Sequence, residues 1–195
     1  MSLRLNPQIL YTAYSQGYFP MPDDRTGEIL WYRPDPRTIF PLDQFHVSRS
    51  LRRTLNKKIF KVTFNKAFRE VMEGCADRKE TWIDEEFIAA YSRLHSIGAA
   101  QSVEVWQDGT LVGGVYGVSF GGGFFAESMF HRATDASKVA LYFLIEKLKE
   151  RRFILLEAQF MTPHLGRLGA IEISDREYME ILAKALALDV YFKAS

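Results

Sequence analysis

The spacing of hydrophobic residues predicts helices in several parts of the chain. Asn6 and Pro7 are a typical helix start, and apolar side chains recur every three or four positions from there to Gly17. The same period predicts helices that begin near Ser48, Asn65, Asp84, Asp135 and Ser174. The residues expected on the buried sides of two of these helices are Phe68, Val71, Met72, Phe87, Tyr91 and Leu94.

A period of two replaces the helical spacing after Gly98. Residues 102–106 and 110–120 alternate in polarity and flank Asp108 and Gly109, a strong hairpin signal because glycine tolerates the positive φ of a tight turn. A glycine turn at 121–123 then leads into a third strand, so the sequence predicts a three-stranded meander.

The run FILLEAQF, residues 153–160, is predicted to be a buried central strand because it is apolar almost throughout. Residues two apart share one face of a strand, so Glu157 and Gln159 are expected to project side by side near its C-terminal end. The alternative is that the strand simply runs out into solvent there. A short strand, AIEI, and a helix follow.

These elements predict an α+β fold with a mixed, mostly antiparallel sheet flanked by helices. Their order resembles the GNAT acyltransferase fold. Prolines cluster before Pro36, and proline disfavours helix before it. We therefore expect a small N-terminal lobe over residues 1–36 and a GNAT-like catalytic domain over residues 37–195.

The composition excludes several classes of protein. The chain of 195 residues is 47% hydrophobic and 25% charged, enough for one full core. No window approaches eighteen consecutive apolar residues, and the start lacks the features of a signal peptide, so we expect a cytoplasmic protein without a membrane anchor. Cys75 is the only cysteine, and the four histidines are scattered, so neither a disulfide within the chain nor a metal site is expected.

The net charge of +1 hides a basic segment, residues 46–69, which carries eight Lys or Arg and no acidic residue. A solvated helix face is the simpler interpretation. The alternative is a phosphate-binding surface, which would make binding strongly dependent on salt.

Glu127 lies among aromatic residues in the stretch GGFFAESMF, residues 122–130. A buried carboxylate needs a partner, so Glu127 either forms an ion pair with Arg132 or lines a cleft. The chain has neither a P-loop nor a serine elbow. The turn SMFHRATDASK also lacks the glycines that cradle the pyrophosphate of coenzyme A in GNAT enzymes, so no cofactor is expected.

Seven stretches in order resemble the bacterial leucyl/phenylalanyl-tRNA–protein transferase family: WYRPDPR, FHVSRSLRR, EGCADRKETWI, SVEVW, LVGGVYGVSFGGGFFAESMF, ASKVAL and LEAQFMTPHLGRLGA. The resemblance implies transfer of Leu or Phe, and less readily Met, from aminoacyl-tRNA to a protein that begins with Arg or Lys. The product carries a degradation signal.

The resemblance also implies residue roles. Gln159 would lie beside the attacking amine, Glu157 would polarise it, and Glu127 would hold the aminoacyl-adenosine end in a cleft where substrate and water are its partners. The other residues implied to bind substrate are Val115, Phe124 and Leu144 as the slot for the donor side chain, Trp82 near the terminal adenosine, and Tyr14 and Trp31. The residues implied to bind the tRNA backbone are Arg49, Arg52, Arg53 and Lys57.

The chain departs from the family pattern at a few positions. Glu157 stands where the shorter Asp is usual, and a displacement of about 1 Å in such a relay can cost roughly a hundredfold in rate. Val115 and Leu144 also differ from the usual slot residues, and Met21 replaces a Trp. A short leading segment is missing and Arg167 replaces a small residue, so tRNA docking is expected to differ.

Two other functions remain open on the sequence. One is a coenzyme-A-dependent N-acetyltransferase on the same fold. The other is a module that binds tRNA or a degradation signal without turnover.

Overall fold

The computed structural model describes residues 5–23, 26–78, 81 and 83–192. The elements, in chain order, are α1 (Pro7–Ser15), β1 (Phe19–Pro22), β2 (Ile29–Tyr32), β3 (Arg37–Ile39), α2 (Arg49–Lys57), β4 (Lys61–Phe64), α3 (Phe68–Ala76), α4 (Glu85–Ser96), β5 (Ala100–Gln107), β6 (Thr110–Phe120), β7 (Gly123–His131), α5 (Ala136–Glu150), β8 (Leu155–Glu157), α6 (Pro163–Arg167), β9 (Ile171–Ile173) and α7 (Asp175–Leu186).

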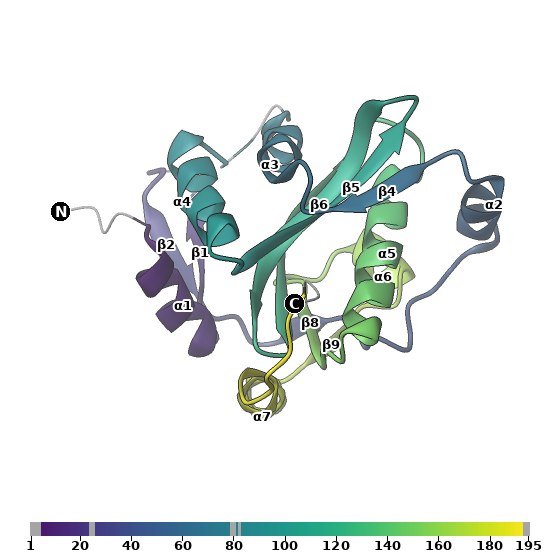
Figure 1. The fold of residues 1–195 in the computed structure, drawn as a ribbon. Helices are drawn as coiled ribbons and strands as arrows, with labels where there is room; N and C mark the ends of the chain where they lie inside the picture. Colours follow the sequence, from purple (N-terminus) through teal and green to yellow (C-terminus); the bar gives the residue numbers. More distant parts are fainter. Residues whose placement is uncertain (1–4, 24–25, 79–80, 82, 193–195) are drawn as a thin grey trace.

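A seven-stranded sheet in the order β4-β5-β6-β7-β8-β3-β9 forms the centre of the fold (Figure 1). Neighbouring strands are antiparallel except β7 and β8, which run parallel because α5 returns the chain between them. The meander β5-β6-β7 and the hairpin turn at Asp108 and Gly109 are confirmed, and both turn residues have positive φ. The predicted α+β class and the mixed, mostly antiparallel sheet are therefore confirmed.

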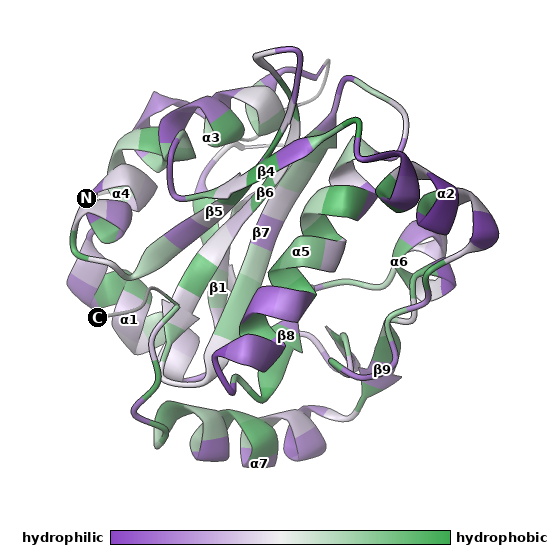
Figure 2. Cartoon of the chain, turned by 45° about the vertical axis from the view of Figure 1, so that its right-hand side comes forward, coloured by the Kyte–Doolittle hydropathy of each residue, from purple (hydrophilic) through white to green (hydrophobic). Residues whose placement is uncertain are grey.

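The two faces of the sheet carry separate hydrophobic clusters. Leu10 of α1, Tyr91 of α4 and Tyr178 of α7 pack on one face, together with the apolar side of α3. On the other face α5 is the main cover, and Leu51 attaches α2 to the same cluster. The outer surface of α2 is hydrophilic in Figure 2, because this helix buries only Leu51 completely.

Side-chain caps explain why several helices begin where the sequence predicts. The Asn6 carboxamide accepts the amide proton of Ile9 at 3.0 Å, and Asp84 accepts that of Phe87 at 2.9 Å. Ser174 begins α7 with a capping box. Such a cap is worth about 1 kcal/mol.

The helix predicted to begin near Asn65 starts at Phe68 instead. Asn65 has φ +58°, which no α-helix accepts, and its side chain accepts the amide proton of Ser102 on β5 at 2.9 Å. Asn65 therefore follows the last residue of β4 and binds β5, and it does not cap α3.

The prediction of a strand over residues 153–160 is wrong in length. Strand β8 covers only Leu155–Glu157, and its pairing with β7 ends at Phe125 opposite Glu157. Beyond that point β7 continues to His131 paired only with β6, whereas the chain after β8 turns away. The two parallel strands thus separate directly beside Glu127.

The division at Pro36 stays a prediction. Strands β1 and β2 form a sheet of their own. Strand β3, which begins at Arg37, is the first element along the chain that joins the large sheet. However, Leu10 and Tyr14 of α1 belong to the same hydrophobic cluster as the large sheet.

Candidate active site

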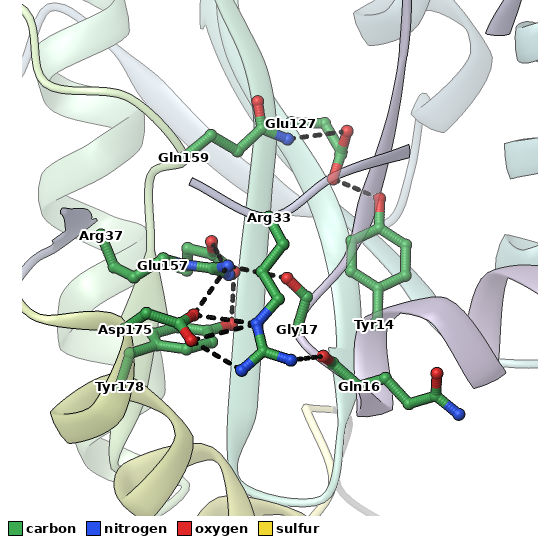
Figure 3. A network of polar contacts seen from close by, with 10 residues as sticks. All are labelled: Tyr14, Gln16, Gly17, Arg33, Arg37, Glu127, Glu157, Gln159, Asp175 and Tyr178. Atoms are coloured by element: carbon green, nitrogen blue, oxygen red, sulfur yellow. Dashed lines mark hydrogen bonds and ion pairs between the residues drawn. The ribbon is translucent and has the colours of Figure 1, made fainter. Parts of the chain in front are cut away.

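Glu127 occupies the point where β7 loses its parallel neighbour. Its side chain is buried, with 7% of the residue exposed, and three protein groups donate hydrogen bonds to it. Figure 3 shows the bonds from Tyr14 and Gln159. The Tyr14 hydroxyl lies 2.5 Å from Oε1, the Gln159 amide 3.2 Å from Oε2, and the Tyr91 hydroxyl 3.4 Å from Oε2. The carboxyl group therefore connects α1, α4 and the chain after β8.

This geometry corrects two expectations for Glu127. The ion pair with Arg132 is wrong, because Arg132 pairs with Asp77 at 3.1 Å. The expectation that substrate and water supply the partners is also wrong for this structure, because tyrosine and glutamine side chains already occupy both carboxyl oxygens.

The protonation of Glu127 follows from its burial. Burial raises the pKa of Glu127 to about 8, the Tyr14 hydroxyl opposes this shift, and the nearby Glu157 adds to it. Burial also raises the pKa of Tyr14 and of Tyr91 well above the usual value, so both hydroxyls keep their protons. Glu127 is thus a carboxyl group that gains or loses a proton near neutral pH. The two tyrosine hydroxyls that donate hydrogen bonds to it stay protonated in this pH range.

Tyr91 is a site residue that the sequence analysis missed. It was expected only as an apolar residue on the inner side of a helix, and it is indeed fully buried. Its hydroxyl also lies 2.8 Å from that of Tyr14. A buried tyrosine hydroxyl needs a hydrogen-bond partner, and this need was the signal available in the sequence.

Gln159 reaches Glu127 because the backbone turns at this residue. Its φ is +61°, a left-handed conformation that is strained for a residue with a side chain. Neighbouring contacts hold the turn: Ala158 donates its amide proton to Thr38 at 2.9 Å, and the Phe160 ring packs edge-on against Phe19 at 5.6 Å. The alternation predicted that Gln159 lies in a strand, and this prediction is wrong. Its side chain nevertheless projects toward Glu127, with which it forms a hydrogen bond.

Glu157 has different partners from those expected. One carboxyl oxygen accepts a hydrogen bond from Arg37 at 2.6 Å, and the other accepts one from the Tyr178 hydroxyl, also at 2.6 Å. No hydrogen bond joins Glu157 to Gln159 among the described residues. A direct action of Glu157 on Gln159 is therefore not part of this arrangement, and its catalytic role stays a prediction.

Arg37 is the second residue that the sequence analysis missed. The residue is fully buried, stacks on the Tyr178 ring at 3.8 Å, and donates a hydrogen bond to the carbonyl of Gly17 at 2.7 Å. Burial raises the pKa of Glu157, while Arg37 and Tyr178 pull it down. Because a guanidinium keeps its proton in proteins, we take Glu157 as its ionised partner.

The expected donor slot lies on the opposite face of the sheet from Tyr14 and Tyr91. Val115, Phe124 and Leu144 belong to one hydrophobic cluster, and each is at most 2% exposed. The structure thus brings these three residues into one cluster, and their contact with a substrate stays a prediction.

Comparison with known proteins decides the family. A profile described as leucyl/phenylalanyl-tRNA protein transferase matches residues 39–183, and one for the N-terminal domain of the same transferase matches residues 4–35. The protein named leucyl/phenylalanyl-tRNA–protein transferase from Herpetosiphon aurantiacus is 54% identical over 98% of this chain and 100% of its own length. The chain belongs to the leucyl/phenylalanyl-tRNA–protein transferase family.

A second relative agrees with this family. The transferase of the same name from Gloeobacter violaceus is 49% identical over 99% of this chain and 100% of its own length. Among solved structures, a GCN5-related N-acetyltransferase from Kribbella flavida matches with a TM-score of 0.44 and 11% identity, over 87% of this chain and 62% of that one.

Trp31 is the expected substrate-binding tryptophan that lies among the described residues. Trp31 lines a hollow of about 400 Å³ on the outer side of α1, together with Ala13 and Tyr18. Glu127 and Gln159 do not line that hollow. Trp82 lies outside the described residues.

The four residues expected to contact tRNA lie on α2. Arg49, Arg52, Arg53 and Lys57 are all exposed, and none forms an ion pair with another described residue. These side chains are therefore available to a phosphate backbone.

No group of three or more His, Cys, Asp or Glu side chains in the described ranges could hold a metal ion. No described helix is long and apolar enough to cross a membrane.

Two substitutions separate the strain at Gln159 from its chemistry. Because φ is positive, Gln159→Gly is expected to be more stable than Gln159→Ala, by about 0.5–1 kcal/mol. Both variants lack the amide that contacts Glu127, so both are expected to lose transferase activity equally. Urea unfolding and initial rates measure the two effects. Wild-type activity in either variant would remove Gln159 from the active site.

Proposed function

We propose that this protein transfers leucine or phenylalanine, and less readily methionine, from aminoacyl-tRNA to the N-terminal Arg or Lys of acceptor proteins, which marks them for degradation. Family membership supports tRNA-dependent aminoacyl transfer to a protein. The observation that carries the mechanism is the hydrogen bond of 3.2 Å between the Gln159 amide and Glu127, at the point where β7 and β8 separate. Such a substrate places the reaction in the cytoplasm.

The chemistry requires little from the enzyme beyond positioning and proton transfer. The donor is an activated ester, so the acceptor amine attacks its carbonyl carbon directly. A peptide bond forms, the ester C–O bond breaks, and the ribose oxygen of the tRNA leaves and takes up a proton. No ATP, coenzyme A or covalent enzyme intermediate is needed, in keeping with a sequence that carries neither a P-loop nor a serine elbow.

In this proposal Gln159 orients the amine and Glu127 accepts its proton. An α-ammonium group has a pKa of about 7.7–8.0, and the pKa of Glu127 is about 8, so the proton moves between groups of matched affinity. Glu157 is a weaker candidate for this step, because Arg37 and Tyr178 occupy its two oxygens. Its role is then to anchor the chain that precedes Gln159.

The cluster of Val115, Phe124 and Leu144 would receive the donor side chain once a path to it opens. A hydrophobic slot separates ligands by only about 1–3 kcal/mol per methylene, so Leu, Phe and Met should all be accepted to different degrees. Trp82 and Trp31 remain candidates for contacts with the nucleotide end of the donor.

A transfer assay tests the function. The protein is incubated with an Arg-initiated peptide and either radiolabelled Leu-tRNA or labelled acetyl-coenzyme A. We expect label in the peptide from Leu-tRNA only. Transfer from acetyl-coenzyme A alone would establish the acetyltransferase alternative, and binding of tRNA and peptide without transfer would establish the non-catalytic one.

Charge reversal on α2 tests the tRNA surface. Arg52→Glu with Arg53→Glu should weaken tRNA binding and lower the slope of log K against log salt by about 2, one unit for each phosphate that is no longer neutralised. Reversal of Arg93 and Lys184, exposed residues of α4 and α7, is the control with the same change in charge. An unchanged slope in the α2 variant would place the tRNA elsewhere.

A further inference from the structure

A second basic feature begins where α2 ends. A hollow of about 620 Å³ lies beside the edge strand β4 and the β5-β6 turn, and its lining includes Lys58, Lys61, Thr63, Lys66, Trp106 and Asp108. Lys58 is the residue that ends α2, so the hollow continues the surface formed by the exposed arginines of that helix. The proposed tRNA contacts do not include any of these residues.

The aromatic wall of the hollow is held in a fixed position. Strand β4 pairs with β5 so that Lys61 lies opposite Trp106 and Thr63 opposite Glu104. The Trp106 indole N–H donates a hydrogen bond to the Thr63 hydroxyl at 2.8 Å, and that hydroxyl donates to Glu104 at 2.5 Å. Trp106 remains partly exposed, so an oriented ring borders the hollow.

The charge of the hollow is positive. Lys58, Lys61 and Lys66 are exposed, and none of them forms an ion pair with another described residue. Asp108 in the turn is the acidic residue of the lining. Glu104 is fully buried behind Thr63, and its oxygens accept hydrogen bonds from Thr63, the Ser102 hydroxyl and the Lys66 amide, so it does not neutralise the lysines at the surface.

We propose that this hollow binds a phosphodiester segment of the donor tRNA, with the lysines on the phosphates and a base or ribose against Trp106. The combination of ammonium groups with an aromatic ring matches a nucleic-acid strand, because phosphates and bases alternate along it. A free phosphate would leave the indole unused, and a lipid surface is too flat for a hollow. This inference rests on the proposed function, because the RNA is the donor of that reaction.

A charge-neutral variant tests the inference without disturbing the core. Lys58→Gln, Lys61→Gln and Lys66→Gln in one protein should raise the dissociation constant for tRNA roughly tenfold or more at 0.1 M salt and lower the salt slope by about 2–3. The control removes three exposed cations from α4 and α7 instead: Arg93→Gln, Arg176→Gln and Lys184→Gln. Trp106→Leu, with the lysines intact, should weaken binding severalfold and leave the slope unchanged, because stacking does not release counterions.

A second donor separates this inference from the proposed function. Phenylalanyl-adenosine lacks the rest of the tRNA, so the parent and the lysine variant should use it at the same rate, while only the parent retains its affinity for Phe-tRNA. If the parent transfers from both donors and the variant binds tRNA as the parent does, the inference about the hollow is wrong. If the parent transfers from neither donor, the proposed function fails. The tRNA affinities of the parent and the lysine variant then still test the inference, and equal affinities would overturn it. Loss of binding to vesicles of anionic lipid, with tRNA binding intact, would assign the hollow to a membrane and overturn the inference.

Discussion

Glu127→Gln is expected to lower kcat about 100-fold or more at pH 7, with little change in KM for the acceptor. The amide keeps the size of the side chain but cannot accept the proton of the attacking amine. In the parent, kcat should rise with pH, reach half its maximum near pH 8 and level off about one pH unit higher, as a base with a pKa of about 8 loses its proton. In the variant, the part of this rise that comes from Glu127 should disappear, and only the ionisation of the acceptor amine should remain.

The groups around Glu127 make this pH profile interpretable. The titratable side chains that act on it are Tyr14 of α1, Tyr91 of α4 and Glu157 of β8, and burial raises the pKa of both tyrosines well above neutral. Glu172→Gln, an exposed glutamate on β9, is the control and should behave as the parent. A Glu127→Gln variant that keeps both its rate and its pH profile would show that another group takes the proton.

The same carboxyl group should make folding stability depend on pH. A carboxyl whose pKa rises on folding, here from about 4.5 to about 8, binds its proton more tightly in the folded state. Its contribution to stability is therefore complete below about pH 4.5 and is lost as pH rises to about 8. Urea unfolding at pH 5 and pH 8 should show a smaller loss in Glu127→Gln than in the parent.

Arg37→Leu is expected to destabilise the protein by about 3–5 kcal/mol. The substitution leaves the carboxylate of Glu157 buried, with 2% of the residue exposed, and without its charged partner. It also removes the stacking on Tyr178 and the hydrogen bond to Gly17. Denaturant unfolding of parent and variant at one pH measures the difference in free energy.

A nearby arginine provides the matched control. Arg33 contacts Asp175 at 2.6 Å, but its side chain is 34% exposed, so Arg33→Leu should cost less than about 1 kcal/mol. Combining Arg37→Leu with Glu157→Leu should recover part of the lost stability, because the unpaired buried charge is then gone. Equal, small decreases in the free energy of unfolding in Arg37→Leu and Arg33→Leu would contradict this prediction. They would show that the buried pair of Arg37 and Glu157 contributes no more to stability than the exposed pair of Arg33 and Asp175.

The periodic parts of the fold could be predicted from sequence, and the short polar parts could not. The hairpin at Asp108 and the capped starts of α1, α4 and α7 follow from local rules, and the structure has them. Strand β3 was missed because it consists of Arg37, Thr38 and Ile39, which carry no alternation of polarity. Its burial depends on Glu157 and Tyr178, which are distant in the sequence.

The candidate site was predictable as a set of residues but not as a network. Glu127 stands out in the sequence as a carboxyl group among aromatic residues, and Gln159 as a polar residue near the C-terminal end of a predicted buried strand. Local sequence does not reveal that the chain turns at Gln159. The left-handed conformation is held by the residues on either side, because Ala158 contacts Thr38 and Phe160 contacts Phe19. The pairing of Tyr14 and Tyr91 with Glu127 likewise depends on two helices that meet only in the folded protein.

A crystal structure with puromycin, which imitates an aminoacylated adenosine, is the most direct measurement of the central claim. We expect its carbonyl carbon to lie beside the side chains of Gln159 and Glu127, with the aromatic side chain among Val115, Phe124 and Leu144. Puromycin bound away from Gln159 and Glu127 would contradict the account.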